Sequence, residues 1–332
     1  MATVFASRGV AVEVVLVDNA SADGTVEAVR AAFPSVVVIA NRDNRGFGAA
    51  NNQALGVLGV VGVVGEGEGV GAGGGDVAMG AAGGRERRSD DGGRAEGGHK
   101  GRPYMDAPSW VLLLNPDTEV DPDAIATLVA VAAGDPGVAV VGPRLRYGDG
   151  AVQPSRFRFP TPWTLLCEST PLGWRWPTNP IARRYHMADV PDAAAHDVDW
   201  LNGAALLCRA EALRAAGGFD EGFFLYSEET DLCRRLRDAG WRVRFEPSAE
   251  VVHHEGRSSD QAPAARHVHF QRSRLRYCAM HHGRAAAAWV RLGVRAEFVA
   301  ELLLEALKWA VGHKRALRAG RVRAYWAVVR SI

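Results

Sequence analysis

The chain has few cysteines and no long apolar run, and both shortages exclude classes of protein. Its 332 residues include four cysteines, which are widely spaced and form no C-x-x-C pair. That pattern argues against a zinc site or a disulfide framework and suits a reducing compartment. No stretch reaches 18 apolar residues, and the first ten residues do not look like a signal peptide. We therefore expect a cytoplasmic protein.

Net charge is also scarce, because 39 Lys and Arg face 38 Asp and Glu. A chain this balanced is not expected to bind nucleic acid. The average hides an asymmetry, since residues 262–332 contain 14 Lys and Arg but only three Glu. We expect two or three helices there, forming a basic C-terminal extension over residues 260–332. Peripheral contact with the inner face of the cell membrane and an ordinary solvated helical surface explain this charge equally well.

Strand-like and helix-like segments alternate along the rest of the chain. A β-rich run at residues 10–17 precedes a helical pattern at residues 25–33, and this order then repeats. The alternation predicts an α/β fold over residues 1–259, with a mostly parallel sheet flanked by helices. Further strands are expected at residues 110–114, 138–141, 200–208 and 241–245, and an irregular surface excursion at residues 153–197.

Glycine interrupts this pattern after the second helix. Residues 56–101 hold 18 of the 38 glycines. Glycine at this density cannot offset its ordering entropy by burial. We expect residues 56–107 to be a disordered insertion between a helix and the strand at residues 110–114.

The most informative motif follows that strand. The apolar run WVLLL ends on Asn115-Pro-Asp-Thr-Glu119. The carboxyl ends of strands in an open α/β sheet are where ligands bind. A carboxylate there, beside a second oxygen ligand, can hold a hard divalent cation against a diphosphate. An ordinary turn is the competing interpretation.

Two polar segments near the N-terminus are candidates for nucleotide binding. Asp18, Asn19 and Ser21 follow the first strand, where short acceptor side chains can bind a ribose or a base edge, although a helix-capping turn is an equally good interpretation. Arg45 lies in a glycine loop ahead of Asn51, and its guanidinium can meet a base or a phosphate.

The densest acidic cluster lies at residues 220–231, and a histidine pair follows it. Five carboxylates within these 12 residues, including Glu228, Glu229 and Asp231, raise one another's pKa values, which suits a general base. An acidic helix start is the alternative. His253 and His254 follow two valines, where an imidazole can ligate a metal or donate to a phosphate.

Taken in order, these segments resemble the family 2 glycosyltransferases, particularly their bacterial rhamnosyltransferase-like branch. The matching strings cover most of residues 12–259 and are VDNASADGT, NRGFGAANNQAL, LLLNPDTEVDPDA, WLNGAALLCR, GGFDEGFFLYSEETDLCRRLRDAGW and VVHHEGRSS. The resemblance implies a GT-A fold and an inverting, metal-dependent transfer of a sugar, and the branch it resembles points to rhamnose. The donor would be dTDP-rhamnose or a UDP-sugar, and the acceptor a cell-envelope glycan or a lipid-linked saccharide.

The resemblance also implies roles for individual residues. Asp117 would ligate Mg²⁺ or Mn²⁺ together with His253 or His254, while Asn115 is a less certain ligand because the family pattern has Asp there. Glu229 would be the base, with Asp231 and Glu228 as further candidates. The donor-binding set would be Asp18, Asn19, Ser21, Arg45, Asn51, Asn115 and Asp117, and the acceptor-binding set Trp200, Asn202 and Asp220.

Two departures from the family pattern leave other functions open. Only about 11 residues precede the VDN strand, so an inner strand of the sheet is expected to be missing, and the glycine-rich insertion precedes the metal strand. An inactive nucleotide-sugar-binding protein or scaffold is therefore the alternative. A nucleotidyltransferase is disfavoured because no glycine-rich phosphate loop with a Lys or Arg is present.

Overall fold

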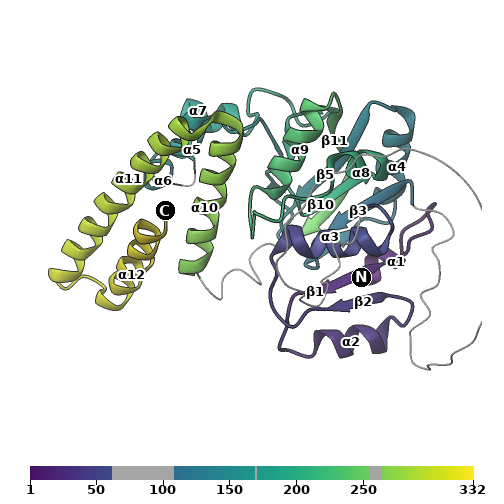
Figure 1. The fold of residues 1–332 in the computed structure, drawn as a ribbon, viewed down its shortest axis with the longest axis horizontal. Coiled ribbons are helices and arrows are strands. Elements are labelled where there is room, and N and C mark those ends of the chain that lie inside the picture. Colours follow the sequence, from purple (N-terminus) through teal and green to yellow (C-terminus); the bar gives the residue numbers. More distant parts are fainter. Residues whose placement is uncertain (62–107, 169, 255–262) are drawn as a thin grey trace, which may run out of the picture.

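The computed structural model describes residues 1–61, 108–168, 170–254 and 263–332. The glycine-rich insertion expected at residues 56–107 lies almost wholly outside these ranges, as does the Gly-Arg-Ser-Ser stretch that follows the histidine pair. Figure 1 shows an α/β unit that carries three C-terminal helices on one side.

The larger sheet has the order β3-β10-β5-β11-β4, with β6 added to β5 and β8 to β11. Its strands are β3 (Trp110–Leu114), β4 (Thr118–Val120), β5 (Val138–Arg146), β6 (Val152–Gln153), β8 (His196–Val198), β10 (Ala205–Arg209) and β11 (Arg242–His253). The expected α/β architecture is present, but the sheet is mixed rather than mostly parallel. Among the described strands of this larger sheet, only β5 and β11 pair in parallel, because β10 lies antiparallel between β3 and β5.

The first strands form a separate small sheet. β1 (Val15–Asp18) pairs in parallel with β2 (Val37–Ala40), with α2 (Thr25–Ala32) between them in the chain and α3 (Phe47–Val57) after them. Among the described residues, β1 pairs only with β2 and β3 only with β10. A short helix α1 (Ala2–Phe5) precedes β1.

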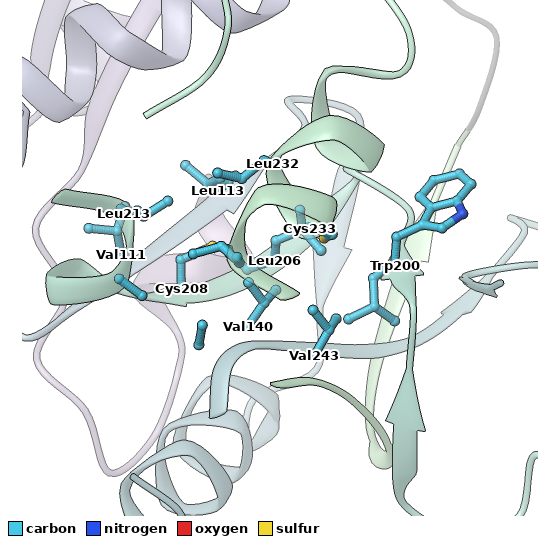
Figure 2. Close-up of a cluster of buried hydrophobic side chains, with 14 of the residues drawn as sticks. Val111, Leu113, Val140, Trp200, Leu206, Cys208, Leu213, Leu232, Cys233 and Val243 are labelled. Carbon is cyan, nitrogen blue, oxygen red and sulfur yellow. The ribbon is translucent and has the colours of Figure 1, made fainter. Parts of the chain in front are cut away.

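The core lies on both faces of the larger sheet. On one face, side chains of β3, β5, β10 and β11 pack against α8 (Ala210–Ala216) and α9 (Glu228–Asp238), as Figure 2 shows for Val140, Leu206, Leu213, Leu232 and Val243. On the other face, α4 (Ala124–Gly134) covers a second apolar cluster. Because both faces of the sheet are covered, β3 can be apolar along its whole length.

The stretch expected to be irregular contains several short elements. They are β7 (Arg156–Phe157), α5 (Pro162–Cys167), α6 (Pro171–Arg175), α7 (Pro180–Tyr185) and β9 (Trp200–Leu201). Each of the three helices begins with proline after a Thr or Asn side chain that accepts a backbone N–H, the arrangement that favours helix initiation.

Three helices complete the chain: α10 (Pro263–His282), α11 (Arg284–Ala310) and α12 (Arg315–Ser331). They share an apolar core with α5 that includes Leu165, Leu275, Val290, Phe298 and Val328. In Figure 1, α10 lies nearest the α/β unit and α11 runs along its far side. None of the described helices combines the length and apolarity needed to span a bilayer.

Candidate active site

Strand pairing brings Asp117 to His253. The β4 strand turns back directly after Asp117, and its first residue, Thr118, pairs with His253 at the end of β11. The Thr118 hydroxyl donates to the Asn115 carbonyl at 2.7 Å and so closes the turn between β3 and β4. Two segments separated by more than 130 residues therefore meet at one sheet edge.

His253 presents Nε2 to this turn. Nε2 lies 3.4 Å from Asp117 Oδ1 and 3.3 Å from Asn115 Nδ2. On its other side, Nδ1 lies 3.1 Å from Gln153 Oε1. Because that oxygen is an acceptor, Nδ1 donates to it, and Nε2 is left facing the carboxylate, where it can share a proton or a cation with Asp117. The hydrogen bond with His253 lowers the pKa of Asp117 despite partial burial.

These residues fit a divalent cation. A lone pair and a carboxylate oxygen that converge at 3.4 Å need a positive charge between them, either a proton or a metal. Neighbouring ligands of an octahedral ion are roughly 3 Å apart, close to the observed separation. Gln153 orients the imidazole, as the outer partners of metal-binding histidines do. Within the described residues no three His, Cys, Asp or Glu side chains gather as a metal site. Asp117 and His253 are therefore a pair of candidate ligands rather than a complete ligand set.

His254 does not belong to this pair. Its Nε2 lies 2.8 Å from Glu119 Oε1, and its backbone N–H donates to the Asp117 carbonyl. Successive residues of a strand face opposite sides, so only one of two adjacent histidines can reach Asp117. The expectation that His254 could complete the metal site is corrected accordingly.

Glu228 and Glu229 form a buried acidic pair at the first turn of α9. The Oε2 atom of each is buried without a hydrogen-bond partner among the described residues. Burial raises the pKa of Glu228 well above its ordinary value, and the neighbouring Glu229 raises it further. Burial also raises the pKa of Glu229, against the effect of backbone N–H groups that include that of Gly203. Glu228 is 3% exposed, and Glu229 is partly exposed as a residue although its Oε2 atom is buried.

The acidic pair is connected to the metal turn through one short segment. Gly203 packs against the Glu229 side chain, and the next residue, Ala204, accepts the Asn115 N–H at 2.9 Å. The Asn115–Asp117 turn and the Glu229 side chain therefore contact the same short loop.

The backbone is strained directly before the pair. Tyr226 and Ser227 have φ values of 71° and 68°, a region that non-glycine residues rarely adopt. Ser227 is the N-cap of α9, yet its side chain makes no capping bond. Such strain persists only where the surroundings impose it, and it is common at functional sites.

Helix α10 supplies those surroundings. Arg276 pairs with Asp220 at 2.7 Å, and the Ser273 hydroxyl donates to the Leu225 carbonyl at 2.7 Å. Rings of α10 also pack on this segment, with His269 stacked on Phe224 and Phe270 against Tyr226. The helix that begins the basic extension thus holds the loop that places Glu228 and Glu229.

Asp231 has a different role from its acidic neighbours. It is completely buried, and its two oxygens lie 2.8 Å from Arg235 Nε and His281 Nε2. Burial alone would raise the pKa of Asp231, but these two bonds lower it overall. A carboxylate that is enclosed and fully paired is a poor base, so we assign Asp231 to joining α9 and α10 rather than to proton abstraction.

Three of the residues expected to bind the nucleotide-sugar, Asp18, Asn19 and Ser21, lie in one turn beside the loop that holds Arg45. Asp18 is buried and accepts the Ser21 N–H at 3.1 Å, which closes the turn after β1. Asn19 donates to the Gly46 carbonyl and accepts from Asn41, so it ties this turn to the loop that holds the exposed Arg45. The capping and ligand-binding interpretations are thus compatible.

Asn51 does not face this turn, because its side chain bonds the Phe47 carbonyl of its own helix. The next residue, Asn52, instead bridges α3 to the Phe219 backbone. Gly46 is required nearby, since a side chain there would clash with the Phe224 carbonyl oxygen.

The acceptor candidates divide into structural and accessible residues. Trp200 is buried, stacks on Phe157 at 4.3 Å and donates to the Arg158 carbonyl, so it belongs to the core. Asn202 caps the Ala204 N–H within the loop that contacts Glu229. Asp220 is engaged by α10. Of the three, only Asn202 lies in the loop beside the base candidate.

Sequence reasoning did not identify Gln153, Asn52 or His281. Gln153 reaches His253 because β6 pairs with β5 in a hairpin, and nothing local distinguishes it. His281 lies in the C-terminal extension over residues 260–332, for which the sequence offered only a basic charge and a helical pattern.

The α/β sheet therefore brings Asp117 and His253 to one edge, and a buried acidic pair lies on α9 nearby. The chain belongs to the family described as glycosyltransferase like family 2, whose profile matches residues 2–268, and it is a glycosyltransferase of GT-A fold. It is 31% identical to the N-acetylglucosaminyl-diphospho-decaprenol L-rhamnosyltransferase of Mycobacterium tuberculosis over 85% of this chain and 80% of the relative.

Two further likenesses are less extensive. A 64-residue segment, 18% of this chain and 24% of the relative, is 41% identical to the rhamnosyltransferase WbbL of Escherichia coli. The solved structure of a mannosyltransferase from Pyrobaculum calidifontis in complex with GDP-Man and Mn²⁺ is 14% identical, with a TM-score of 0.49 over 99% of this chain and 80% of that one.

Proposed function

We propose that this enzyme is an inverting, metal-dependent rhamnosyltransferase that moves L-rhamnose from dTDP-L-rhamnose to a lipid-linked saccharide of the cell envelope. The observation that carries the proposal is the Asp117–His253 pair at 3.4 Å, joined through the Gly203–Ala204 segment to Glu229. It supplies a cation site and a base in one loop-bounded region.

Glu229 accepts the proton of the acceptor hydroxyl. As its carboxylate takes that proton, the acceptor oxygen bonds to C1 of the sugar, and the bond from C1 to the diphosphate oxygen breaks with its electrons leaving on the diphosphate. A base whose pKa is raised toward working pH is suited to this transfer. Glu228 repels charge on Glu229 and so strengthens its proton affinity.

Asp117 and His253 would hold the cation, with Gln153 fixing the imidazole. When bound, Mg²⁺ or Mn²⁺ would stabilise the negative charge that develops on the departing diphosphate. Asp18, Asn19 and Arg45 are the residues we propose for the nucleoside end, because their turn and loop are tied together beside α3.

Rhamnose and a lipid-linked acceptor are proposed from the relative with the longest match described above. Its name specifies an L-rhamnosyl transfer to an N-acetylglucosaminyl-diphospho-decaprenol, and the alignment extends over most of both chains. We propose the same classes of donor and acceptor here.

The test is transfer by the purified full-length chain with Mn²⁺, polyprenyl-diphospho-N-acetylglucosamine and either dTDP-L-rhamnose or UDP-sugars. We expect a rhamnosylated lipid by mass spectrometry, with inverted configuration at C1 by NMR, and no product from Asp117→Ala. Product from a UDP-sugar alone would overturn the donor assignment. Donor binding without turnover of any nucleotide sugar would favour the inactive-binder alternative, to which the separate β1–β2 sheet gives structural support.

A further inference from the structure

Helix α11 carries an apolar row on its solvent side. Val290, Val294 and Phe298 are fully buried against α10 and α12 on one face. The opposite face holds large apolar side chains at helical spacing that are 39–70% exposed, namely Trp289, Leu292, Val299, Leu303 and Leu307. With 27 residues the helix is about 40 Å long, and the row extends along most of it. Single exposed apolar residues are normal on a protein surface, whereas a continuous row of them indicates a binding surface.

The charges around this row are of one sign. Arg284, Arg291 and Arg295 are exposed and fall on one side of it. The three glutamates of the helical unit are buried or partly buried: Glu301 and Glu305 are buried and paired with Arg175 and Arg318, and the partly buried Glu297 accepts the Leu172 N–H. The described surface of α10, α11 and α12 therefore exposes mainly cations.

Two tryptophans mark the N-terminal end of the row. Trp163 of α5 is 60% exposed and packs edge-on against Trp289 with ring centroids 4.7 Å apart. Tryptophan is enriched where protein meets the headgroup region of a bilayer.

We propose that this face of α11, with Trp163, lies in the surface of an anionic lipid bilayer. An apolar row with arginines beside it and tryptophans at one end matches an interfacial helix, which buries its apolar face at the boundary of headgroups and acyl chains. The inference rests on the proposed function in one respect, because it names where a lipid-linked acceptor would be met.

A second copy of the chain is the competing occupant, and the charges argue against it. Two such faces brought together would place Arg284, Arg291 and Arg295 of both copies at one interface, with no fully exposed carboxylate on the described helical unit to compensate. An anionic surface instead attracts these residues.

The test is co-sedimentation with bare vesicles, without nucleotide sugar or metal. We expect the full chain to bind vesicles of equal parts phosphatidylglycerol and phosphatidylcholine, less so at high salt, and to bind phosphatidylcholine alone weakly. The triple variant Leu292→Gln, Leu303→Gln and Leu307→Gln should lower partitioning by about tenfold or more. Arg291→Gln with Arg295→Gln should remove the preference for phosphatidylglycerol.

The matched control is Val37→Gln on β2, an apolar side chain of 39% exposure outside the helical unit, which should bind as the parent does. Circular dichroism confirms that each variant is folded. Equal vesicle binding by the triple variant would overturn the proposal. So would a dimer in sedimentation velocity that the triple variant abolishes, since the row would then be an interface between copies. Because no donor is present, failure here leaves the transferase assignment standing.

Discussion

At the scale of single residues, the orientation of one imidazole decides whether this chain can hold a cation. His253 is 6% exposed and contacts Gln153 on one side and the Asp117 turn on the other. Gln153 is itself buried, so the imidazole cannot rotate without leaving a buried polar group unpaired. The cation site that we propose therefore depends on the buried Gln153 side chain as well as on Asp117 and His253.

Gln153→Ala should weaken Mn²⁺ binding by about 10- to 100-fold, because the imidazole loses the acceptor that fixes its tautomer. The measurement is a Mn²⁺ titration followed by electron paramagnetic resonance, which needs no turnover. Gln153→Glu, which keeps an acceptor at this position, is the matched control and should bind nearly as well as the parent. An unchanged affinity in Gln153→Ala would show that His253 is not a ligand.

Much of this site could be predicted from the sequence, and the remainder depended on contacts between distant segments. Asp117 was identified because an apolar strand ends on an acidic turn, which is a local pattern. The choice between His253 and His254 needed the strand to extend through residue 253, after which the alternation of side chains decides it. Gln153 could not be predicted, because its role depends on the register of the β5–β6 hairpin.

Glu229→Gln should lower kcat by about 100-fold or more while leaving the donor Kd nearly unchanged, since only proton abstraction is removed. In the parent, activity at saturating Mn²⁺ should rise with pH as the acidic pair loses a proton. The midpoint should lie above the ordinary glutamate pKa of about 4.3, because burial raises both pKa values. A midpoint at the ordinary value, or equal loss of binding and turnover, would contradict the base assignment.

At the scale of elements, α9 and α10 act together, since α10 holds the turn that precedes α9. The sequence pattern predicted the helices but not the contacts between them. The sequence indicated a helix start at the acidic cluster as one interpretation and helices within residues 260–332, and the structure has α9 and α10 there. What could not be foreseen is that α10 holds the strained turn before α9, because those contacts join residues about 50 positions apart. Local periodicity carries no information about such pairing.

Asp231→Asn should destabilise the protein by about 3–5 kcal/mol, the usual effect of breaking a buried ion pair. The folded-state pKa of Asp231 is lowered, so its contribution is fully present above the unfolded pKa of about 3.9 and is lost as pH falls through the folded value. The difference from the parent should therefore be constant between about pH 7 and 5 and shrink below about pH 4.

Urea unfolding at these pH values measures the effect. Asp238→Asn, at the exposed Arg234 pair of the same helix, is the control and should change stability by less than about 1 kcal/mol. If Asp231→Asn instead kept full stability and lost only kcat, Asp231 would act in proton transfer after all.

At the scale of the whole molecule, the α/β class and the family followed from ordered motifs, whereas the sheet pairing did not. Strands β3, β5 and β11 were recognised as buried runs, but the antiparallel entry of β10 is a matter of topology. The basic extension could be located by its charge, yet its attachment to the active-site loop through α10 makes it part of the enzyme's architecture. Stability of the three-helix unit and activity should therefore be linked.

Phe298→Ala tests that link. Phe298 is fully buried in the helical core, with Trp174 and Tyr325 rings against it, and its truncation should cost about 3–5 kcal/mol. We expect a lower melting temperature by tryptophan fluorescence, and loss of transferase activity on heating at that same lower temperature, because α10 no longer holds the loop before Glu228. Leu303→Ala, on the exposed side of the same helix, should change the free energy of unfolding by less than about 0.5 kcal/mol. Activity that persisted above the melting of the helical unit would show that the extension unfolds independently and that α10 is not needed to place the acidic pair.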